Sequence, residues 1–583
     1  MFLLGAIIGL IFFAIEFGLP LANPTNTNWI FYPITHDTAQ HFLGWEFFRQ
    51  ASSGATITSL ATPIGLPITY MDGIPLLALP FKLFANVLPT NFQYFGAWAL
   101  LCYILLGGLA AILMRKIWCK VFAKYSGKSL WQILFVAAGS LIIVLNPVTL
   151  ARTLYHSALA AQWLILLAII LIWDAKKFAK WWQFTLVWSA FLVVATLIHP
   201  YFLPMLGAMM VIAVLRNLVK FDKRSVAKLL AKIIVPVVCA GATFYLLGGF
   251  SLGGGAAEVY DLPDKGFNLI SFLMDNGWSA VVPGIPAHSG SPETMMWLGL
   301  GVWLLAILAI IFGVKLWKKL YRNSRNESKK ISFADWLWQA FVAKFRVNFS
   351  RNLTMAVVAF ALLCFAIGVS VEIGPLRIFT WRPPTPIWDF WNIFRAAARE
   401  AWPFYFAAIL LIIFAAGKII FAKFGKKNTP KIFALVILLA AGIQFVDIFF
   451  SPMATNKREN FAKVQSAGSR YFTAPKINDL VTTQQNIVVL DKGFATDQSG
   501  FYELGQAALR NKMTMNLGYF SRVPDAIFTQ QAAWRTKILT GKLTAQDLRE
   551  NLFTTKDANF AKQASRNYTI IQRGNFYFIA AKL

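Results

Sequence analysis

Residues 2–21 read FLLGAIIGLIFFAIEFGLPL, an apolar run whose one charged residue is Glu16. A helix needs roughly 20 such residues to cross the hydrocarbon core of a bilayer. The small-residue stretch PLANP at 20–24 is typical of a signal-peptide cleavage site, but no positively charged segment precedes the run. We therefore expect residues 2–21 to form an uncleaved first membrane helix.

The rest of the chain has the same character. Of its 583 residues 57% are hydrophobic and 14% charged, against about 25% charged in soluble proteins. The composition predicts an α-helical polytopic membrane protein, and the short, proline-rich stretch 73–89 is expected to be interfacial or re-entrant. We assign about 11 transmembrane helices, near 2–21, 92–114, 129–146, 155–173, 181–198, 202–216, 229–248, 296–314, 353–372, 401–417 and 432–450.

The basic residues divide unevenly between the two sets of loops. One set holds 29 of the 55 Lys and Arg and the opposite set eight, so the positive-inside rule makes the first set cytoplasmic. The N-terminus is then cytoplasmic. The net charge of +29 reflects this topology and contact with anionic membrane lipids, and we expect no nucleic-acid partner. The 29 lie in 115–128, 176–180, 216–232, 315–351 and 418–431.

Two domains are expected, a transmembrane domain over 1–450, with a first outer loop at 22–91 carrying interfacial helices, and a small extracytoplasmic α/β domain over 451–583. The second region is more polar and alternates regularly. Its patterns predict a buried strand at 486–491, helices at 499–512 and 544–553, and a hairpin at 568–583.

The first outer loop gathers titratable residues in FYPITHDTAQHFLGWEFFR (31–49). On a helix from about 36 to 49, one face holds Asp37, Gln40, His41, Gly44 and Phe48. Such a helix would be amphipathic and lie along the membrane interface. Asp37 is then a candidate general base for a lipid-borne substrate; the alternative is that it caps the helix, as Thr35 also can.

Arginines form the other candidate site. Arg395 and Arg399 are four apart in WNIFRAAAREAWP (391–403), so on a helix they would share a face and favour a bridging anion such as phosphate. The alternative is a pair that extends to the membrane surface at the start of the tenth span. Arg152 and His156 have the same spacing at the start of the fourth span.

No cofactor is expected. The four cysteines lie in or beside apolar segments and form no metal-binding cluster. A divalent metal held by His36, Asp37, His41 and Asp72 is the alternative.

The five histidines all fall in outer loops or at outer helix ends, and no charged residue lies clearly at the middle of a span. This distribution disfavours an ion-coupled transporter.

Several segments together resemble GT-C glycosyltransferases, and more closely an uncharacterised bacterial family of polytopic GT-C-like proteins. They are HDTAQHFLGWEFFR (36–49), GLPITYMDGIPLLALPFK (65–82), NFQYFGAWALLC (91–102), LARTLYHSALAAQW (150–163), FRAAAREAW (394–402) and MNLGYFSR (515–522).

The resemblance implies a multi-pass enzyme of the bacterial cytoplasmic membrane that transfers a sugar from a polyprenyl-phosphate donor to a cell-envelope glycan, lipid or polymer, with inversion. Asp37 would be the base, and the acidic partner found beside it in many GT-C enzymes is replaced here by His36 and Thr38. The competing class is a non-catalytic protein of polysaccharide export or assembly, a flippase or a partner. The candidate substrate-binding residues are Arg395, Arg399, Arg152, His156, His41, Asp72 and His36.

The uneven distribution of Lys and Arg predicts the topology directly. A reporter enzyme that is active only outside the cytoplasm should be active when fused after Leu583 and inactive when fused at Asn323. Fusion activities in the opposite sense would overturn both the orientation and an outer-face site.

Overall fold

The structure is a computed structural model of the chain. It describes all residues except 32–36, 52–53, 123–128, 179, 217–222, 252–264, 289–290, 325–348, 468–473, 521 and 583.

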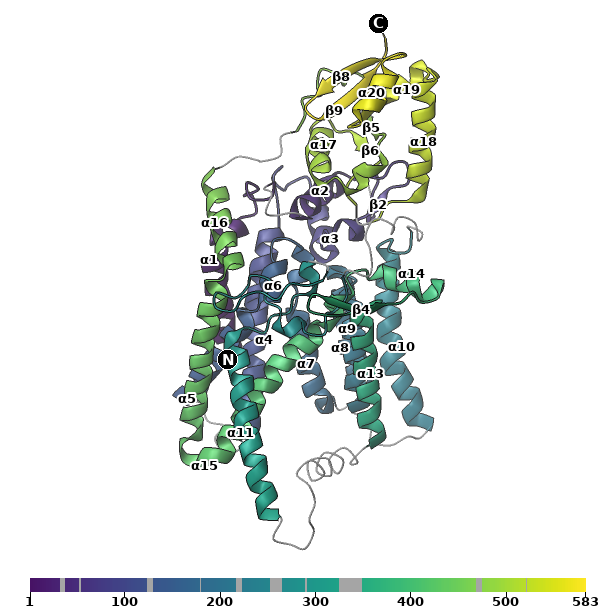
Figure 1. Cartoon of the computed structure of the whole chain (residues 1–583). Helices are drawn as coiled ribbons and strands as arrows, with labels where there is room; N and C mark the ends of the chain where they lie inside the picture. Colours follow the sequence, from purple (N-terminus) through teal and green to yellow (C-terminus); the bar gives the residue numbers. More distant parts are fainter. Residues whose placement is uncertain are drawn as a thin grey trace.

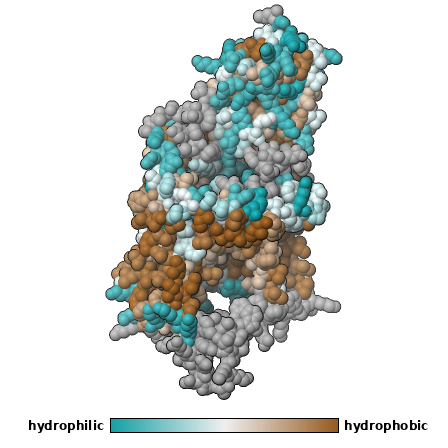
Figure 2. Space-filling model, in the orientation of Figure 1, coloured by the Kyte–Doolittle hydropathy of each residue, from teal (hydrophilic) through white to brown (hydrophobic). Residues whose placement is uncertain are grey.

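Apolar helices make up the body of the molecule. Five segments of the described chain are long and apolar enough to cross a membrane, and six shorter apolar helices accompany them. On the face that Figure 2 shows, a hydrophobic belt crosses this part, with hydrophilic surface above it. These helices are α1 (Phe2–Glu16), α4 (Phe95–Val121), α5 (Leu130–Val144), α7 (Trp163–Trp173), α8 (Trp181–Ile198), α9 (Phe202–Arg216), α10 (Lys223–Leu246), α11 (Leu300–Ser324), α13 (Phe349–Ile367) and α15 (Trp402–Phe449).

Each predicted span overlaps one of these apolar segments, because hydropathy over a window of this length is a local property of the sequence. The last two spans lie in α15, whose apolar segments Ala397–Phe424 and Asn428–Phe449 are separated by a lysine-rich middle, where α15 bends sharply in Figure 1. The count of eleven spans remains a prediction. The stretch 73–89 contains α3 (Pro75–Leu83), and nine residues at about 1.5 Å each are too short to cross a bilayer.

The C-terminal part forms a five-stranded sheet with the order β6-β5-β7-β9-β8. β5 runs parallel to β6 and β7, whereas β9 is antiparallel to β7 and β8. The predicted strand, helices and hairpin are all present, although the helix expected at 544–553 ends at Glu550 and continues as a strand. The strands are β5 (Asn486–Val489), β6 (Thr514–Met515), β7 (Asn551–Thr555), β8 (Thr569–Arg573) and β9 (Phe576–Ala580), and the helices are α16 (Pro452–Ala467), α17 (Gln498–Arg510), α18 (Asp525–Leu539), α19 (Ala545–Glu550) and α20 (Ala558–Ala564).

This C-terminal sheet lies at one end of the apolar helices, whereas the chain ends of α10 and α11 that border basic loops lie at the opposite end (Figure 1). The two ends are therefore on opposite sides of the hydrophobic belt. This arrangement agrees with the predicted separation of the basic loops from residues 451–583.

The first loop pairs directly with the C-terminal sheet. The Met515 N–H donates to the Ser59 carbonyl oxygen at 2.8 Å, and the Thr62 N–H donates to the Met515 carbonyl oxygen at 3.2 Å. Helix α17 also packs closely on α2 (Asp37–Gln50), since a Cβ added at Gly505 would lie 3.2 Å from Leu43. The sheet and the first loop therefore form one continuous structure.

Helix α2 begins and ends close to the predicted limits, but it is not amphipathic. Ten of its fourteen residues are buried, because α17 covers one side and η3 (Ile68–Met71) another. Gly44 allows the second approach, since an added Cβ would lie 2.6 Å from the Cβ of Met71. The prediction of an amphipathic face is therefore wrong for α2, which is enclosed by protein. Its position along the membrane interface stays a prediction.

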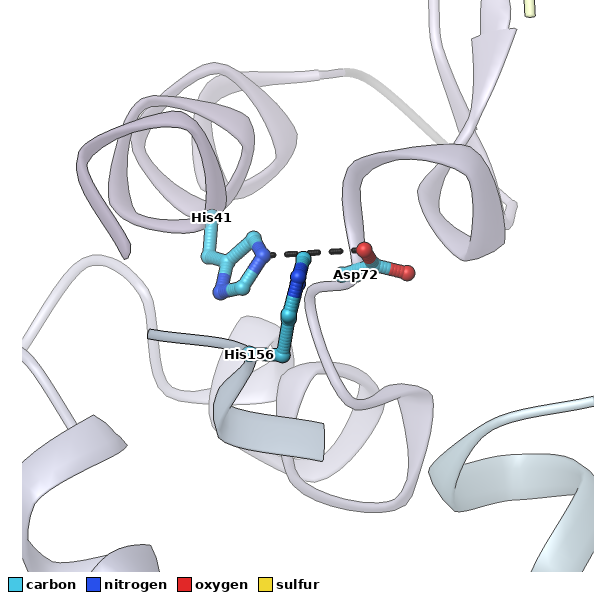
Figure 3. Close-up of side chains that lie close together, drawn as sticks. All are labelled: His41, Asp72 and His156. Atoms are coloured by element: carbon cyan, nitrogen blue, oxygen red, sulfur yellow. Dashed lines mark ion pairs between the residues drawn. The ribbon is translucent and has the colours of Figure 1, made fainter. Parts of the chain in front are cut away.

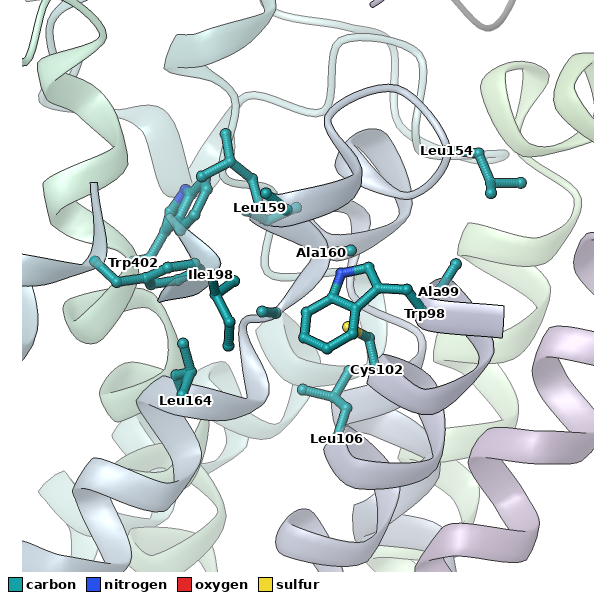
Figure 4. Packing of buried hydrophobic residues seen from close by; sticks show 14 of the residues in the cluster. Trp98, Ala99, Cys102, Leu106, Leu154, Leu159, Ala160, Leu164, Ile198 and Trp402 are labelled. Carbon is teal, nitrogen blue, oxygen red and sulfur yellow. The ribbon is translucent and has the colours of Figure 1, made fainter. Parts of the chain in front are cut away.

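Below α2, large side chains from several helices pack into one core. Figure 4 shows Trp98 and Cys102 of α4 beside residues of η4 (Ser157–Ala160) and α7, with Trp402 nearby. The Trp98 indole N–H donates to the Ser157 carbonyl oxygen at 2.8 Å. This core supports α6 (Pro147–Arg152) and the loop that follows it, which carry the predicted site residues Arg152 and His156. The remaining elements are α14 (Thr385–Ile393), β1 (Thr56–Ile57), β2 (Leu66–Pro67), β3 (Ser370–Ile373) and β4 (Leu376–Thr380), with short 3-10 turns between helices.

Candidate active site beneath the C-terminal domain

Asp37 is the first residue of α2, and its carboxylate meets side chains from three other segments. The Gln498 amide donates to Oδ1 at 2.8 Å, and the Tyr519 hydroxyl lies 3.4 Å from the same oxygen. His156 Nδ1 lies 3.1 Å from Oδ2. A carboxylate offers about four acceptor positions, so these contacts leave room for a further donor. The side chain is 15% exposed. The remaining acceptor position therefore suits a small donor, such as the hydroxyl group of another molecule.

A second carboxylate, Asp72, lies between two histidines. His199 Nε2 is 3.0 Å from Oδ1, and His41 Nε2 is 3.6 Å from Oδ2. The Tyr201 N–H donates to His199 Nδ1, so the ring proton of a neutral His199 is on Nε2 and points at Asp72. Burial by itself raises the pKa of Asp72, but the histidines His199 and His41 hold that pKa well below its usual value. Asp72 is therefore a carboxylate at neutral pH.

Glu293 joins two of the predicted arginines. Arg152 donates to it with both terminal nitrogens, at 3.0 and 2.7 Å, and Arg399 donates at 2.9 and 2.6 Å. All three side chains are less than 10% exposed. Burial raises the pKa of Glu293, but the charges of Arg152 and Arg399 outweigh burial and hold the pKa well below its usual value. Glu293 thus neutralises one of the two arginine charges.

More positive charge lies next to this triad. The guanidinium of Arg399 lies 4.9 Å from the ring centre of Tyr201, whose hydroxyl accepts the Ala396 N–H at 3.2 Å. Burial lowers the pKa of Lys265, and the charges of Arg395 and Arg399 lower it further. Asp37 and Glu293 act on Lys265 in the opposite sense. Asp72 also acts on Arg399. Four cations therefore lie within electrostatic range of three carboxylates, and the positive charge that remains favours an anion.

The structure brings several predicted residues together, but from separate elements and not from one helix. Helix α14 ends at Ile393 and η10 begins at Ala397, so Arg395 and Arg399 do not stack on one helix. Arg152 ends α6, and His156 precedes η4, so these two do not share a helix either. The prediction that Arg395 and Arg399 share a helix face is wrong, because the chain turns between them; a turn also separates Arg152 from His156. His36 lies outside the described residues.

Several site residues were not predicted. Glu293 lies in the polar stretch HSGSPET (288–294), and Lys265 directly follows Asp264. Neither has an Arg or His partner at the four-residue spacing that drew attention to Arg152. His199 follows the end of α8 and was noted only as an outer histidine. Tyr519 lies in MNLGYFSR (515–522), which carries part of the family resemblance, and Gln498 gives no signal in the sequence. Both reach Asp37 only through the docking of the C-terminal domain on the first loop.

The fold and this site define a polytopic helical membrane protein with a cluster of charged side chains between its apolar helices and a C-terminal α/β domain. The chain belongs to the family described as "Domain of unknown function (DUF6311)", whose model matches residues 6–449. Residues 477–581 match the DUF6311 C-terminal domain.

Two solved structures of an archaeal oligosaccharyltransferase from Archaeoglobus fulgidus are similar over most of this chain. AglB in complex with an inhibitory peptide and a dolichol-phosphate is 13% identical, with coverage of 97% of this chain and 72% of that chain and a TM-score of 0.31. The apo form is also 13% identical, with coverage of 98% and 74% and a TM-score of 0.35. The comparison with curated proteins finds no match.

The triad makes a prediction about stability. Glu293→Gln would leave two buried guanidinium groups without their shared counter-charge, and breaking a buried ion pair in this way costs about 3–5 kcal/mol. We expect a clearly lower melting temperature for the purified protein in detergent. The control is Asp479→Asn, because Asp479 pairs with Arg573 and the two side chains are 59% and 37% exposed. This variant should melt close to the wild type. Equal melting of the two variants would contradict the structural role of Glu293.

Proposed function

We propose that the chain is an inverting GT-C-type glycosyltransferase that moves a sugar from a polyprenyl-phosphate donor to an acceptor glycan, lipid or polymer at the outer face of the cytoplasmic membrane. The observation that carries the proposal is the position of Asp37, a partly exposed carboxylate within electrostatic range of a cationic cluster. Such a transfer needs two groups: a base that takes the proton of the acceptor hydroxyl, and cations that bind the leaving phosphate.

Asp37 supplies the base. Its contacts with His156, Gln498 and Tyr519 fix the orientation of the carboxylate and leave an acceptor position for the hydroxyl of the incoming molecule. As that oxygen attacks the anomeric carbon of the sugar, its proton passes to Asp37, and the bond from the anomeric carbon to the phosphate oxygen breaks. The configuration inverts because the hydroxyl attacks on the side opposite to the leaving phosphate.

The cationic cluster receives the phosphate. Glu293 neutralises one of the two charges of Arg152 and Arg399, so Arg395 and Lys265 supply most of the remaining positive charge. Arginine binds phosphate oxygens through two parallel hydrogen bonds. The polyprenyl chain stays between the apolar helices while its phosphate meets these side chains at the membrane surface. They stabilise the negative charge that grows on the phosphate as the sugar leaves.

The C-terminal domain contributes two side chains to the surroundings of Asp37. Gln498 and Tyr519 lie over Asp37, and the Gln40 amide donates to the Tyr519 carbonyl oxygen at 2.8 Å. We infer that the acceptor reaches Asp37 past this domain, which presents it to the base. A non-catalytic export or assembly protein would have no need for a base at this position, so the variant described next separates the two classes.

Asp37→Asn keeps the shape of the side chain and removes its basicity. We expect the variant to insert, fold and bind polyprenyl phosphate like the wild type, and to lose transfer by about 10²–10⁴-fold. A panel of radiolabelled polyprenyl-phosphate sugars, incubated with membranes that contain either protein, measures the loss. Asn caps helices as well as Asp does, so full activity of Asp37→Asn would leave only a capping role. Glu46→Gln is the matched control, because Glu46 pairs with Arg49.

Arg395→Ala tests the phosphate contact. Loss of one charged hydrogen bond costs about 1.5–3 kcal/mol, so polyprenyl phosphate should bind about ten- to a hundred-fold more weakly in a detergent-based binding assay. Lys318→Ala removes an exposed charge at the other end of the helices and should bind normally. Arg399→Ala is less informative, because it also breaks the pairing with Glu293. Unchanged binding by Arg395→Ala would place the phosphate elsewhere.

A further inference from the structure

Three possible metal ligands converge above the core. His41 comes from α2, Asp72 follows η3, and His156 precedes η4. One ligand atom from each lies within 4.8 Å of those of the other two. Figure 3 shows the His41 ring pointing at the Asp72 carboxylate, with the His156 ring beside the line between them. This set differs from the one considered from the sequence, because His156 comes from a distant part of the chain.

His41 is the side chain that most needs a partner here. It is fully buried, and neither ring nitrogen has a hydrogen-bond partner among the described residues. An unsatisfied buried polar group costs about 1–3 kcal/mol. Its Nε2 lies 3.6 Å from Asp72 Oδ2, which is too long for a hydrogen bond. Two ligands each about 2.1 Å from a tetrahedral metal ion are about 3.4 Å apart, so this separation suits two ligands of one ion.

The surrounding contacts orient two of the three groups. Asp37 holds His156 through Nδ1, which leaves Nε2 as the other donor of that ring. His199 donates to Oδ1 of Asp72, which leaves Oδ2 directed at His41. Metal-binding histidines and carboxylates are commonly fixed in this way by a carboxylate or a hydrogen-bond donor behind them.

We propose that His41, Asp72 and His156 bind one divalent transition-metal ion of the Zn²⁺ type. Two imidazole nitrogens and one carboxylate oxygen are ligands typical of zinc and its neighbours, whereas Mg²⁺ and Ca²⁺ prefer oxygen ligands alone. Three protein ligands leave at least one coordination position for water or a substrate oxygen. The proposal stands apart from the glycosyltransferase proposal, because it concerns binding and not transfer.

Metal binding to the full-length protein tests it directly. The protein is purified in detergent through a tag without histidines, stripped with a chelator and titrated with Co²⁺ and with Zn²⁺. We expect one ion per chain by elemental analysis, a visible Co²⁺ absorption band that Zn²⁺ removes, and no removal by excess Mg²⁺. X-ray absorption of the Zn²⁺-loaded wild type should show two imidazole ligands. A wild type that binds neither ion, or binds without imidazole ligands, would overturn the site.

Variants assign the ligands. His41→Gln, Asp72→Asn and His156→Gln should each lose the Co²⁺ band. His288→Gln should keep it, because His288 lies in another loop and contacts the Pro375 carbonyl oxygen. Asp37→Asn and His199→Gln should bind about 10–100-fold more weakly, since these residues only orient the ligands. Undiminished binding by the three ligand variants would overturn the assignment, whatever the transfer activity of Asp37→Asn.

Discussion

The salt bridge of Glu293 with Arg152 and Arg399 is the contact on which the rest of the site depends. It joins segments that are 141 and 106 residues from Glu293 in the sequence. A charged group buried without a partner costs several kcal/mol. Separating any one of the three side chains from the other two would therefore lower the stability of the fold by a similar amount. The loop after α6 and the η10 segment are therefore fixed relative to each other. The first carries His156 to Asp37, and the second places Arg399 against Tyr201.

A second constraint comes from backbone pairing between two parts of the chain. The first loop lies along β6 through hydrogen bonds on both sides of Met515. This pairing sets the position of Tyr519 over Asp37 and seats α17, with Gln498 at its first turn, on α2. The candidate base is thus oriented from below by His156 and from above by the C-terminal domain. Changes in the docking of that domain would alter the surroundings of Asp37 without touching the membrane helices.

The successes and failures of the sequence predictions have a common physical basis. Helix α2 and the hairpin of β8 and β9 were both expected, because turn residues and periodicity act over a few neighbours. The amphipathic face of α2 was predicted wrongly, because its second covering surface is α17, which lies more than 400 residues further along the chain. The shared helix face of Arg395 and Arg399 was also predicted wrongly, because spacing alone does not show where a helix ends.

The sequence by itself determined that this is a helical membrane protein with a charged loop after its first helix and a small α/β domain at its end. Hydropathy, charge bias and alternation are sums over neighbouring residues, so they can be read without the fold. It also singled out Asp37. Only the tertiary structure decided that Arg152 and Arg399 share Glu293, that Tyr519 and Gln498 reach Asp37 across 482 and 461 residues, and that His41 faces Asp72. Such partners are selected by burial and by the packing of distant segments, because a charged or polar group removed from water must be satisfied by whatever the fold brings beside it.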